Sequence, residues 1–182
     1  MKIFLLLLVV SLVGCVATPR GTYYMPTNPI GESRSQTCDF NGNKVNLTIL
    51  LNQNVRLEAH LIPIQNDSLE LKFGFLVPKN SRINLSSNTV YISTEKFNSE
   101  QYEIIQWRSL ILDGGEEILL IGKDEFKYAK QYWNEVIIKN TGQKKVTLNM
   151  PHFSISGVDI NLEPIIFELK SGELHWFPAL NC

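Results

Sequence analysis

The sequence predicts an all-β protein, an antiparallel β-sandwich of immunoglobulin-like type with about nine or ten strands. Three observations support this prediction. Apolar and polar residues alternate with a period of two in several segments, the segments recur at intervals of roughly 8 to 15 residues, and turn residues separate them. Helical periodicity is scarce along the 182 residues. The pattern does not define the order of the strands in each sheet.

The first half of the folded region holds the clearest strands. Asn41-Gly42 is the dipeptide that most strongly favours a tight hairpin turn, and extended segments lie on both sides of it. Farther along, residues 55–61 and 69–77 alternate over their whole length, as expected for strands with one buried face. The extended segments in this half, which are the candidates for strands, cover residues 37–40, 44–51, 55–61, 69–77, 83–85 and 90–93.

The second half continues with shorter extended segments between turns. Asp113-Gly114-Gly115 is a turn sequence, and residues 141–143 favour a hairpin between the strands on either side of them. The candidate extended segments in this half cover residues 102–112, 117–121, 136–138, 146–150, 153–157, 158–162, 165–169 and 173–177.

Residues 124–133 fit two kinds of structure. Ala129 and Trp133 have helical spacing, whereas Tyr128 and Tyr132 are typical strand residues. The pattern leaves a short helix and a strand equally open for this segment.

The N-terminus has the composition of an export signal. Lys2 precedes an apolar run over residues 3–13, which is too short to span a hydrocarbon core of about 30 Å and has the proportions of a signal-peptide core. Residues 12–15, LVGC, resemble the lipobox of bacterial lipoproteins, in which a lipid-modified cysteine becomes the mature N-terminus. An ordinary secretory leader cut near the same place is the alternative.

The resemblance implies a signal peptide over residues 1–14 and a lipid anchor on Cys15, built from diacylglycerol and palmitate. Several acyl chains together anchor a protein durably, because each buried methylene contributes about 0.8 kcal/mol. Val16, and not an aspartate, follows the cysteine. By resemblance to enterobacterial lipoproteins, this implies the outer membrane of a bacterial cell envelope as the location.

The segment that begins at Cys15 differs in composition and periodicity from the rest of the chain. Residues 15–36 contain prolines and glycines without a sustained period, which predicts a lipid-anchored flexible tether that reaches on the order of 25 Å. Tyr23-Tyr24-Met25 is its one apolar patch, and it either docks onto the domain or lies near lipid headgroups. Residues 37–182 are expected to form a single domain.

The remaining cysteines predict one disulfide. Once the resemblance assigns Cys15 to lipid, Cys38 and Cys182 form an even pair in an exported, oxidising compartment. Domain termini often lie close together, so a bond between these two cysteines is geometrically reasonable. Closing so long a loop contributes at most about 5 kcal/mol in the chain-entropy model. Two unpaired thiols are the alternative.

The sequence contains no pattern typical of catalysis, cofactor binding or metal binding. His60, His152 and His175 stand apart from one another, and neither a nucleophile elbow nor a Gly-rich phosphate loop is present. With 17 basic and 18 acidic residues, the chain is nearly neutral, which argues against nucleic acid as a partner. We therefore expect no catalytic residue, no cofactor and no metal.

Three tryptophans are the candidate binding residues of the domain. Exposed indoles form stacking surfaces for sugars or anchor points for a protein partner. In a β-sandwich, however, large aromatic residues also fill the core, and this alternative stays open for each of them. The candidates are Trp107, Trp133 and Trp176.

These observations together favour a membrane-anchored envelope lipoprotein that is not an enzyme. We expect it to act as a binding or structural module, with another envelope protein as its partner. A module that binds glycan or peptidoglycan through exposed tryptophans is the main alternative. A hydrolase whose site has no recognisable motif is a weaker one.

Overall fold

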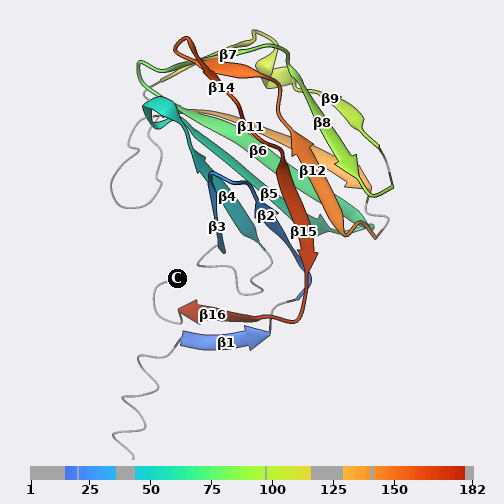
Figure 1. Ribbon diagram of the computed structural model, residues 1–182. Helices are drawn as coiled ribbons and strands as arrows, with labels where there is room; N and C mark the ends of the chain where they lie inside the picture. The colour runs from blue at the N-terminus through green and yellow to red at the C-terminus, as the bar shows by residue number, and fades with distance from the viewer. Residues whose placement is uncertain are drawn as a thin grey trace, which may run out of the picture.

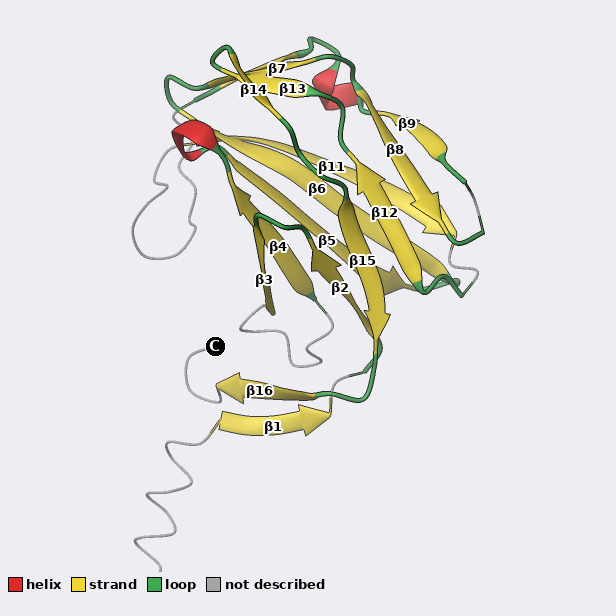
Figure 2. Ribbon diagram, in the orientation of Figure 1, coloured by secondary structure: helices red, strands yellow, loops and turns green. Residues whose placement is uncertain are grey.

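The computed structural model describes residues 15–19, 21–35, 44–96, 98–115, 129–139 and 142–178, with the backbone alone for 15–19 and 174–178. Throughout this part every strand pair is antiparallel. The strands form two five-stranded sheets, one four-stranded sheet and a two-stranded ribbon (Figures 1 and 2). No α-helix occurs among these residues, so the predicted all-β class is confirmed.

The two large sheets face each other across a shared core (Figure 1). The first sheet contains, in spatial order, β11 (Ala129–Lys139), β6 (Ser68–Pro78), β5 (Arg56–Ile64), β4 (Val45–Leu50) and β3 (Gly31–Ser35). The second sheet contains β2 (Tyr23–Thr27), β15 (Ile165–Lys170), β12 (Lys145–Asn149), β8 (Thr89–Thr94) and β9 (Glu100–Glu103).

A smaller sheet, here called the end sheet, covers one end of the sandwich, and a ribbon lies at the other end (Figure 1). The end sheet contains β10 (Ile111–Asp113), β7 (Arg82–Leu85), β13 (Phe153–Ile155) and β14 (Val158–Ile160). The ribbon pairs β1 (Cys15–Pro19) with β16 (Leu174–Pro178), and the two 3₁₀ turns are η1 (Asn52–Asn54) and η2 (Ile105–Trp107).

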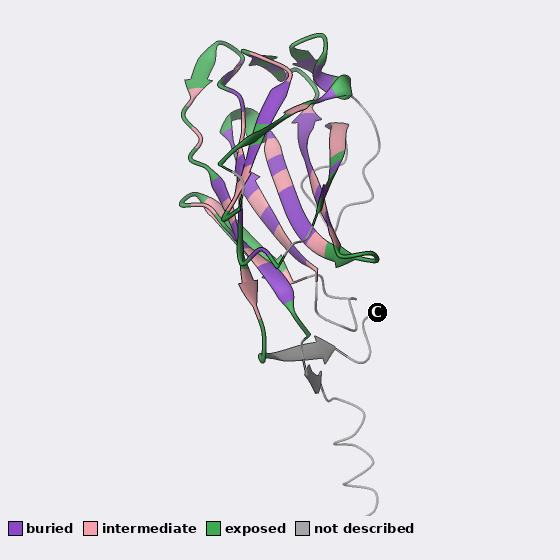
Figure 3. Ribbon diagram, turned by 90° about the vertical axis from the view of Figure 1, so that its right-hand side faces the viewer, coloured by how far each residue is buried: buried purple, intermediate pink, exposed green. Residues whose placement is uncertain are grey.

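Because apolar and polar residues alternate along the strands, each sheet has one buried face and one outer face (Figure 3). On β5 and β6 the register places Ala59 beside Phe73 and Leu61 beside Leu71, all fully buried. One continuous hydrophobic cluster includes these residues, the inner residues of the second sheet and those of the end sheet. Such a cluster is the core of a β-sandwich, although this strand order does not establish an immunoglobulin-like topology.

The prediction of a flexible tether over residues 15–36 is wrong for residues 23–35, which form β2 and β3. Tyr23 and Tyr24 are buried, and the Tyr24 hydroxyl donates a hydrogen bond to the Gln143 carbonyl at 2.7 Å. Pro26 fits within β2 because this strand lies at a sheet edge, where a missing N–H is tolerated. Of the two alternatives for Tyr23-Tyr24-Met25, docking onto the domain is therefore correct.

Two further predictions fail because connections cross between sheets. The strands on either side of residues 141–143 do not form a hairpin, since β11 pairs with β6 whereas β12 pairs with β8 and β15. Residues 102–112 do not form one strand either. They divide into the end of β9, the turn η2 and the start of β10, because η2 carries Trp107 into the core.

Of residues 124–133, for which the sequence left a helix and a strand open, the described part forms a strand. Residues 129–133 begin β11, which runs for 11 residues. Residues 124–128, the predicted strands at 37–40 and 117–121, and the Asn41-Gly42 turn lie outside the described residues. The other predicted strands are present, with bounds that differ by a few residues.

We expect replacement of Gly74 by alanine to destabilise the pairing of β6 with β11. A Cβ atom there would lie 2.5 Å from the carbonyl oxygen of Tyr132 and 2.8 Å from the Cα of Trp133, both in the opposite strand. Because these are backbone atoms, one strand must shift, at an expected cost of about 1 to 3 kcal/mol in unfolding free energy. Chemical denaturation measures it.

Gly115→Ala is the matched control for this experiment. The three atoms nearest to its Cβ would be side-chain atoms of Lys130, the closest being Cβ at 3.2 Å, a contact that a shift of a few tenths of an ångström relieves. Equal losses of stability in the two variants would contradict the close approach of β11 over Gly74.

Candidate functional site

The two long sides of the sandwich differ. On one side the chain passes from β2 in the second sheet to β3 in the first, and β2 packs against β4 and β5. On the other side the described sheets end at β11 and β9, and two adjoining cavities of about 690 and 370 Å³ lie along this side. We call this feature the β9–β11 groove.

The groove has apolar walls and a polar rim. Ile104 and Val136 are buried in the wall of the larger cavity, and Ile92 and Ile138 are buried in the wall of the smaller one. The lining of the larger cavity comprises Lys72, Tyr102, Glu103, Ile104, Ile105, Gln106, Trp133, Asn134, Glu135, Val136 and Ile137. The smaller is lined by Ile92, Thr94, Glu100, Tyr102, Ile137, Ile138 and Lys139.

Two isoleucines of the groove are exposed. Ile105 on η2 is 68% exposed and Ile137 on β11 is 50% exposed. Ile137 lines both cavities and therefore marks the place where they meet. Exposed apolar side chains beside a cavity are typical of interaction surfaces.

Lys72 and Tyr102 of the groove both form polar contacts within the protein. Lys72 forms ion pairs with Glu70 and, at 3.3 Å, with Glu135. The Tyr102 hydroxyl donates a hydrogen bond of 2.5 Å to Glu100. Burial, together with the Glu100 carboxylate, raises the pKa of Tyr102 to about 12, so this hydroxyl stays protonated at neutral pH.

Of the predicted binding residues, Trp133 lies at the groove. Its half-buried indole packs against Leu76 and Ala129, and its Nε1 donates a hydrogen bond to Gln131 Oε1 at 2.9 Å. The register places Trp133 opposite Gly74, whose lack of a side chain lets β11 approach β6 closely. Trp133 is therefore a surface residue with a fixed orientation.

The prediction of an exposed binding residue is wrong for Trp107, which is fully buried. Its ring centroid lies 5.7 Å from that of Phe73 and 5.6 Å from that of Phe75. Phe75 in turn contacts Phe153 of the end sheet at 5.3 Å. Trp107 thus belongs to an aromatic cluster that joins the first sheet to the end sheet, as the core alternative expected.

The remaining predicted site residues are described only in part. Trp176 lies in β16 and Cys15 begins β1, and for both only the backbone is described, with Cys15 opposite Pro178. Cys38 and Cys182 lie outside the described residues.

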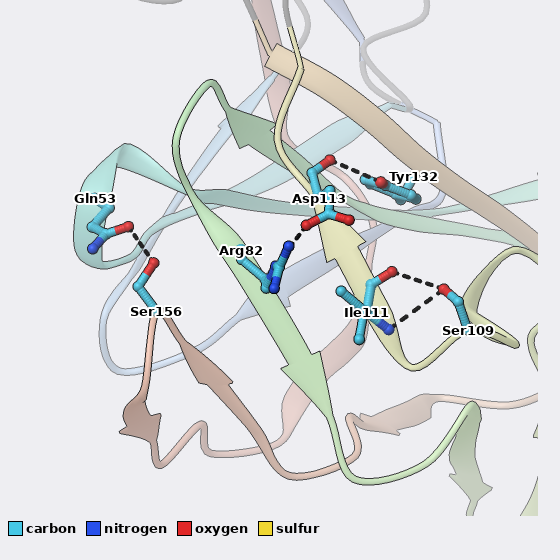
Figure 4. Close-up of polar contacts among 7 residues, drawn as sticks. All are labelled: Gln53, Arg82, Ser109, Ile111, Asp113, Tyr132 and Ser156. Carbon is cyan, nitrogen blue, oxygen red and sulfur yellow. Dashed lines mark hydrogen bonds and ion pairs between the residues drawn. The ribbon is translucent and has the colours of Figure 1, made fainter.

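A second polar region lies at the end sheet (Figure 4). Arg82 and Asp113 form an ion pair at 2.6 Å across β7 and β10, and the Tyr132 hydroxyl donates to the Asp113 carbonyl at 2.9 Å. Ser156 donates to Gln53 at 2.7 Å between a hairpin turn and η1. These contacts are exposed and join neighbouring elements, so they help to hold the end sheet in place.

The outer face of the first sheet carries a buried histidine. His60 lies opposite Lys72, and its Nε2 has no hydrogen-bond partner among the described residues. Burial, reinforced by Lys44 and Lys72, lowers the pKa of His60 to about 4, with Glu70 opposing weakly. His60 is therefore neutral at physiological pH.

We expect the stability of the protein to rise with pH between about 4 and 6.5, partly because of His60. The unfolded histidine, with its ordinary pKa of 6.5, binds a proton in this range that the folded histidine does not, so acid favours unfolding. The gain in unfolding free energy is complete above pH 6.5 and amounts to about 3 kcal/mol. Denaturation at several pH values measures it.

His60→Gln serves as the reference for this measurement, because glutamine does not titrate. The difference in unfolding free energy between wild type and variant should change across this pH range. A constant difference would show that His60 protonates equally in both states.

Sequence reasoning did not find Glu135, Ile137 and Ile105. The only available signal was the outer face of β11, where Trp133, Glu135 and Ile137 alternate with inward residues and mix apolar with charged side chains. Exposure depends on where the sheets end, which this alternation does not define.

The described residues contain no cluster of three or more histidine, cysteine, aspartate or glutamate side chains placed to hold a metal. Within the same part of the chain, no helix is long and apolar enough to cross a membrane. Comparison with known proteins found no matching family model, curated protein or solved structure.

Proposed function

We propose that the protein is a lipid-anchored module of the bacterial cell envelope, located at the outer membrane, that binds a protein partner without catalysis. The lipobox-like residues 12–15 support the anchor on Cys15. The observation that carries the binding role is the β9–β11 groove, where two cavities adjoin exposed apolar side chains.

The chemistry of the groove supports a protein as the partner. Its buried wall residues are aliphatic, and Ile105 and Ile137 are its exposed large apolar side chains. Protein interfaces typically combine such an apolar centre with a polar rim, which Glu103 and Glu135 supply here. Trp133 adds an aromatic residue of the type that dominates binding energy at interfaces.

Position-specific photocrosslinking in cells tests this proposal. A benzoylphenylalanine placed at Ile137 should yield a discrete crosslinked envelope protein, identified by mass spectrometry. The same residue placed at Val158 of the end sheet, which is 54% exposed, is the matched control and should not yield that product. The same products from both positions, or none from Ile137, would count against a partner at the groove.

Glycan binding is the second candidate, and Trp133 is the observation that favours it. Its indole lies among polar groups that suit sugar hydroxyls, including Gln131, Asn134 and Glu135. Soluble peptidoglycan fragments titrated against tryptophan fluorescence distinguish the two candidates. A saturable change that Trp133→Ala abolishes would favour glycan.

We further expect a disulfide between Cys38 and Cys182 in the exported protein, since both lie in an oxidising compartment if the anchor assignment is correct. Mass spectrometry of the non-reduced, digested protein should detect a peptide pair joined through these residues. Free thiols at both positions after isolation under acid quench would refute the bond.

A further inference from the structure

We propose that the β9–β11 groove binds an extended peptide segment of another envelope protein, apolar in its middle and carrying one basic residue, by strand addition to the edge of β11. This inference rests on the proposed function and specifies the class of partner. The peptide would extend the first sheet by one strand.

The backbone of β11 supplies the first argument. Among the described strands β11 pairs with β6 alone, over all of its 11 residues, and it is the last strand of its sheet. An edge strand presents a row of N–H and C=O groups that only another extended chain satisfies fully. The two cavities lie beside residues 133–139, so space for such a chain exists along this half of the edge.

The shape of the groove supplies the second argument. Alternate residues of an added strand point inward toward the core, as Val136 and Ile138 do in β11. Val136 and Ile104 line one cavity, and Ile138 and Ile92 line the other. Two inward apolar side chains of a peptide therefore find one apolar cavity each, on either side of Ile137.

Charge complementarity selects the basic residue. Glu103 and Glu135 both line the larger cavity, whose one cationic lining residue, Lys72, is shared between Glu70 and Glu135. Glu103 is 3.6 Å from Arg108, at an exposed position where such pairs are weak. A lysine or arginine of the peptide at this end of the groove would meet a net negative rim.

The test uses the mature, lipid-anchored protein in detergent micelles and labelled ten-residue peptides. One peptide alternates valine and threonine with a lysine at its N-terminus, and a second places the lysine at its C-terminus. A matching pair carries glutamate in place of lysine. In a third pair, methyl groups on alternate backbone amides block strand addition and leave the side chains unchanged. Fluorescence anisotropy measures binding.

We expect a lysine peptide to bind saturably, and the glutamate and N-methylated peptides to bind at least about tenfold more weakly, since one lost charged contact or a few lost hydrogen bonds is enough for such a change. Ile137→Asp should abolish binding and Glu135→Lys should shift the preference toward the glutamate peptide. Val158→Asp, on the exposed end sheet, should change nothing.

Three results would overturn the proposal. Equal binding of N-methylated peptides would show that the backbone of β11 is not used. Absence of peptide binding, with crosslinks at Ile137 retained in cells, would leave the proposed function intact and reject strand addition. Dimers in sedimentation analysis that Ile137→Asp dissociates would assign the edge to a second copy of this chain.

Discussion

Replacement of Trp107 by alanine is expected to destabilise the protein by about 3 to 5 kcal/mol, the range for removal of a fully buried aromatic side chain. The indole is fully buried and contacts both Phe73 and Phe75. Its removal leaves a cavity between the first sheet and the turn η2 that neighbouring rings cannot fill completely. Because a single domain is stable by only about 5 to 15 kcal/mol, the variant should unfold at a markedly lower denaturant concentration.

Trp107→Phe is the informative companion variant. The indole Nε1 is buried without a hydrogen-bond partner among the described residues, so phenylalanine removes an unsatisfied polar group along with some volume. The loss should therefore be well below that of alanine. If phenylalanine proved as costly as alanine, Nε1 would have to make a hydrogen bond that this geometry lacks.

Strand positions were predictable wherever one face of a strand meets the core and the other meets solvent. Residues 55–61 and 69–77 alternate strictly, and they form β5 and β6 at the centre of the first sheet. Strand partners were not predictable. The strands β11 and β12 follow each other in the chain yet belong to different sheets, because their apolar faces fit opposite sides of one core.

The N-terminal segment shows why composition alone misleads. Its prolines and glycines suggested a flexible chain, but a short edge strand needs few backbone hydrogen bonds and accepts proline. Burial of Tyr23 and Tyr24 stabilises β2 as the edge strand of the second sheet. The two tyrosines were the only available sign of this docking, and two apolar side chains in sequence do not define what they pack against.

The candidate site was only partly predictable, for a related reason. Trp133 was selected for its residue type, which is correct for the groove, whereas Trp107 was selected on the same ground and fills the core. Trp133 and Trp107 differ in exposure because Trp133 lies on the outer face of β11, whereas the turn η2 directs Trp107 into the core. Neither can be derived without knowing that the described sheets end at β9 and β11.

The position of Cys15 in the fold changes what an anchor there would do. Because β1 begins at Cys15 and residues 23–35 belong to the sheets, little free chain lies between Cys15 and the domain. Acyl chains on Cys15 would hold the ribbon end of the sandwich close to the bilayer and direct the end sheet away from it (Figure 1). The 25 Å reach expected of a flexible tether is then lost.

Replacement of Cys15 by serine is expected to abolish acylation and to release the protein from membranes. Only a thiol accepts the diacylglycerol group that the lipobox implies, and without acyl chains the remaining apolar leader of about 11 residues is too short to span the bilayer. Incorporation of labelled palmitate and partition into a detergent phase measure the two effects. Wild type should be labelled and enter the detergent phase, and the variant should do neither.

Cys38→Ser is the matched control, since it removes a cysteine outside the leader. It should leave palmitate incorporation and membrane retention unchanged, which separates lipid attachment at Cys15 from a general effect of losing a cysteine. Palmitate on the Cys15→Ser protein, or unchanged fractionation with membranes, would reject residues 12–15 as a lipobox. The groove would then belong to a secreted protein, and its partner would have to be sought without reference to a membrane.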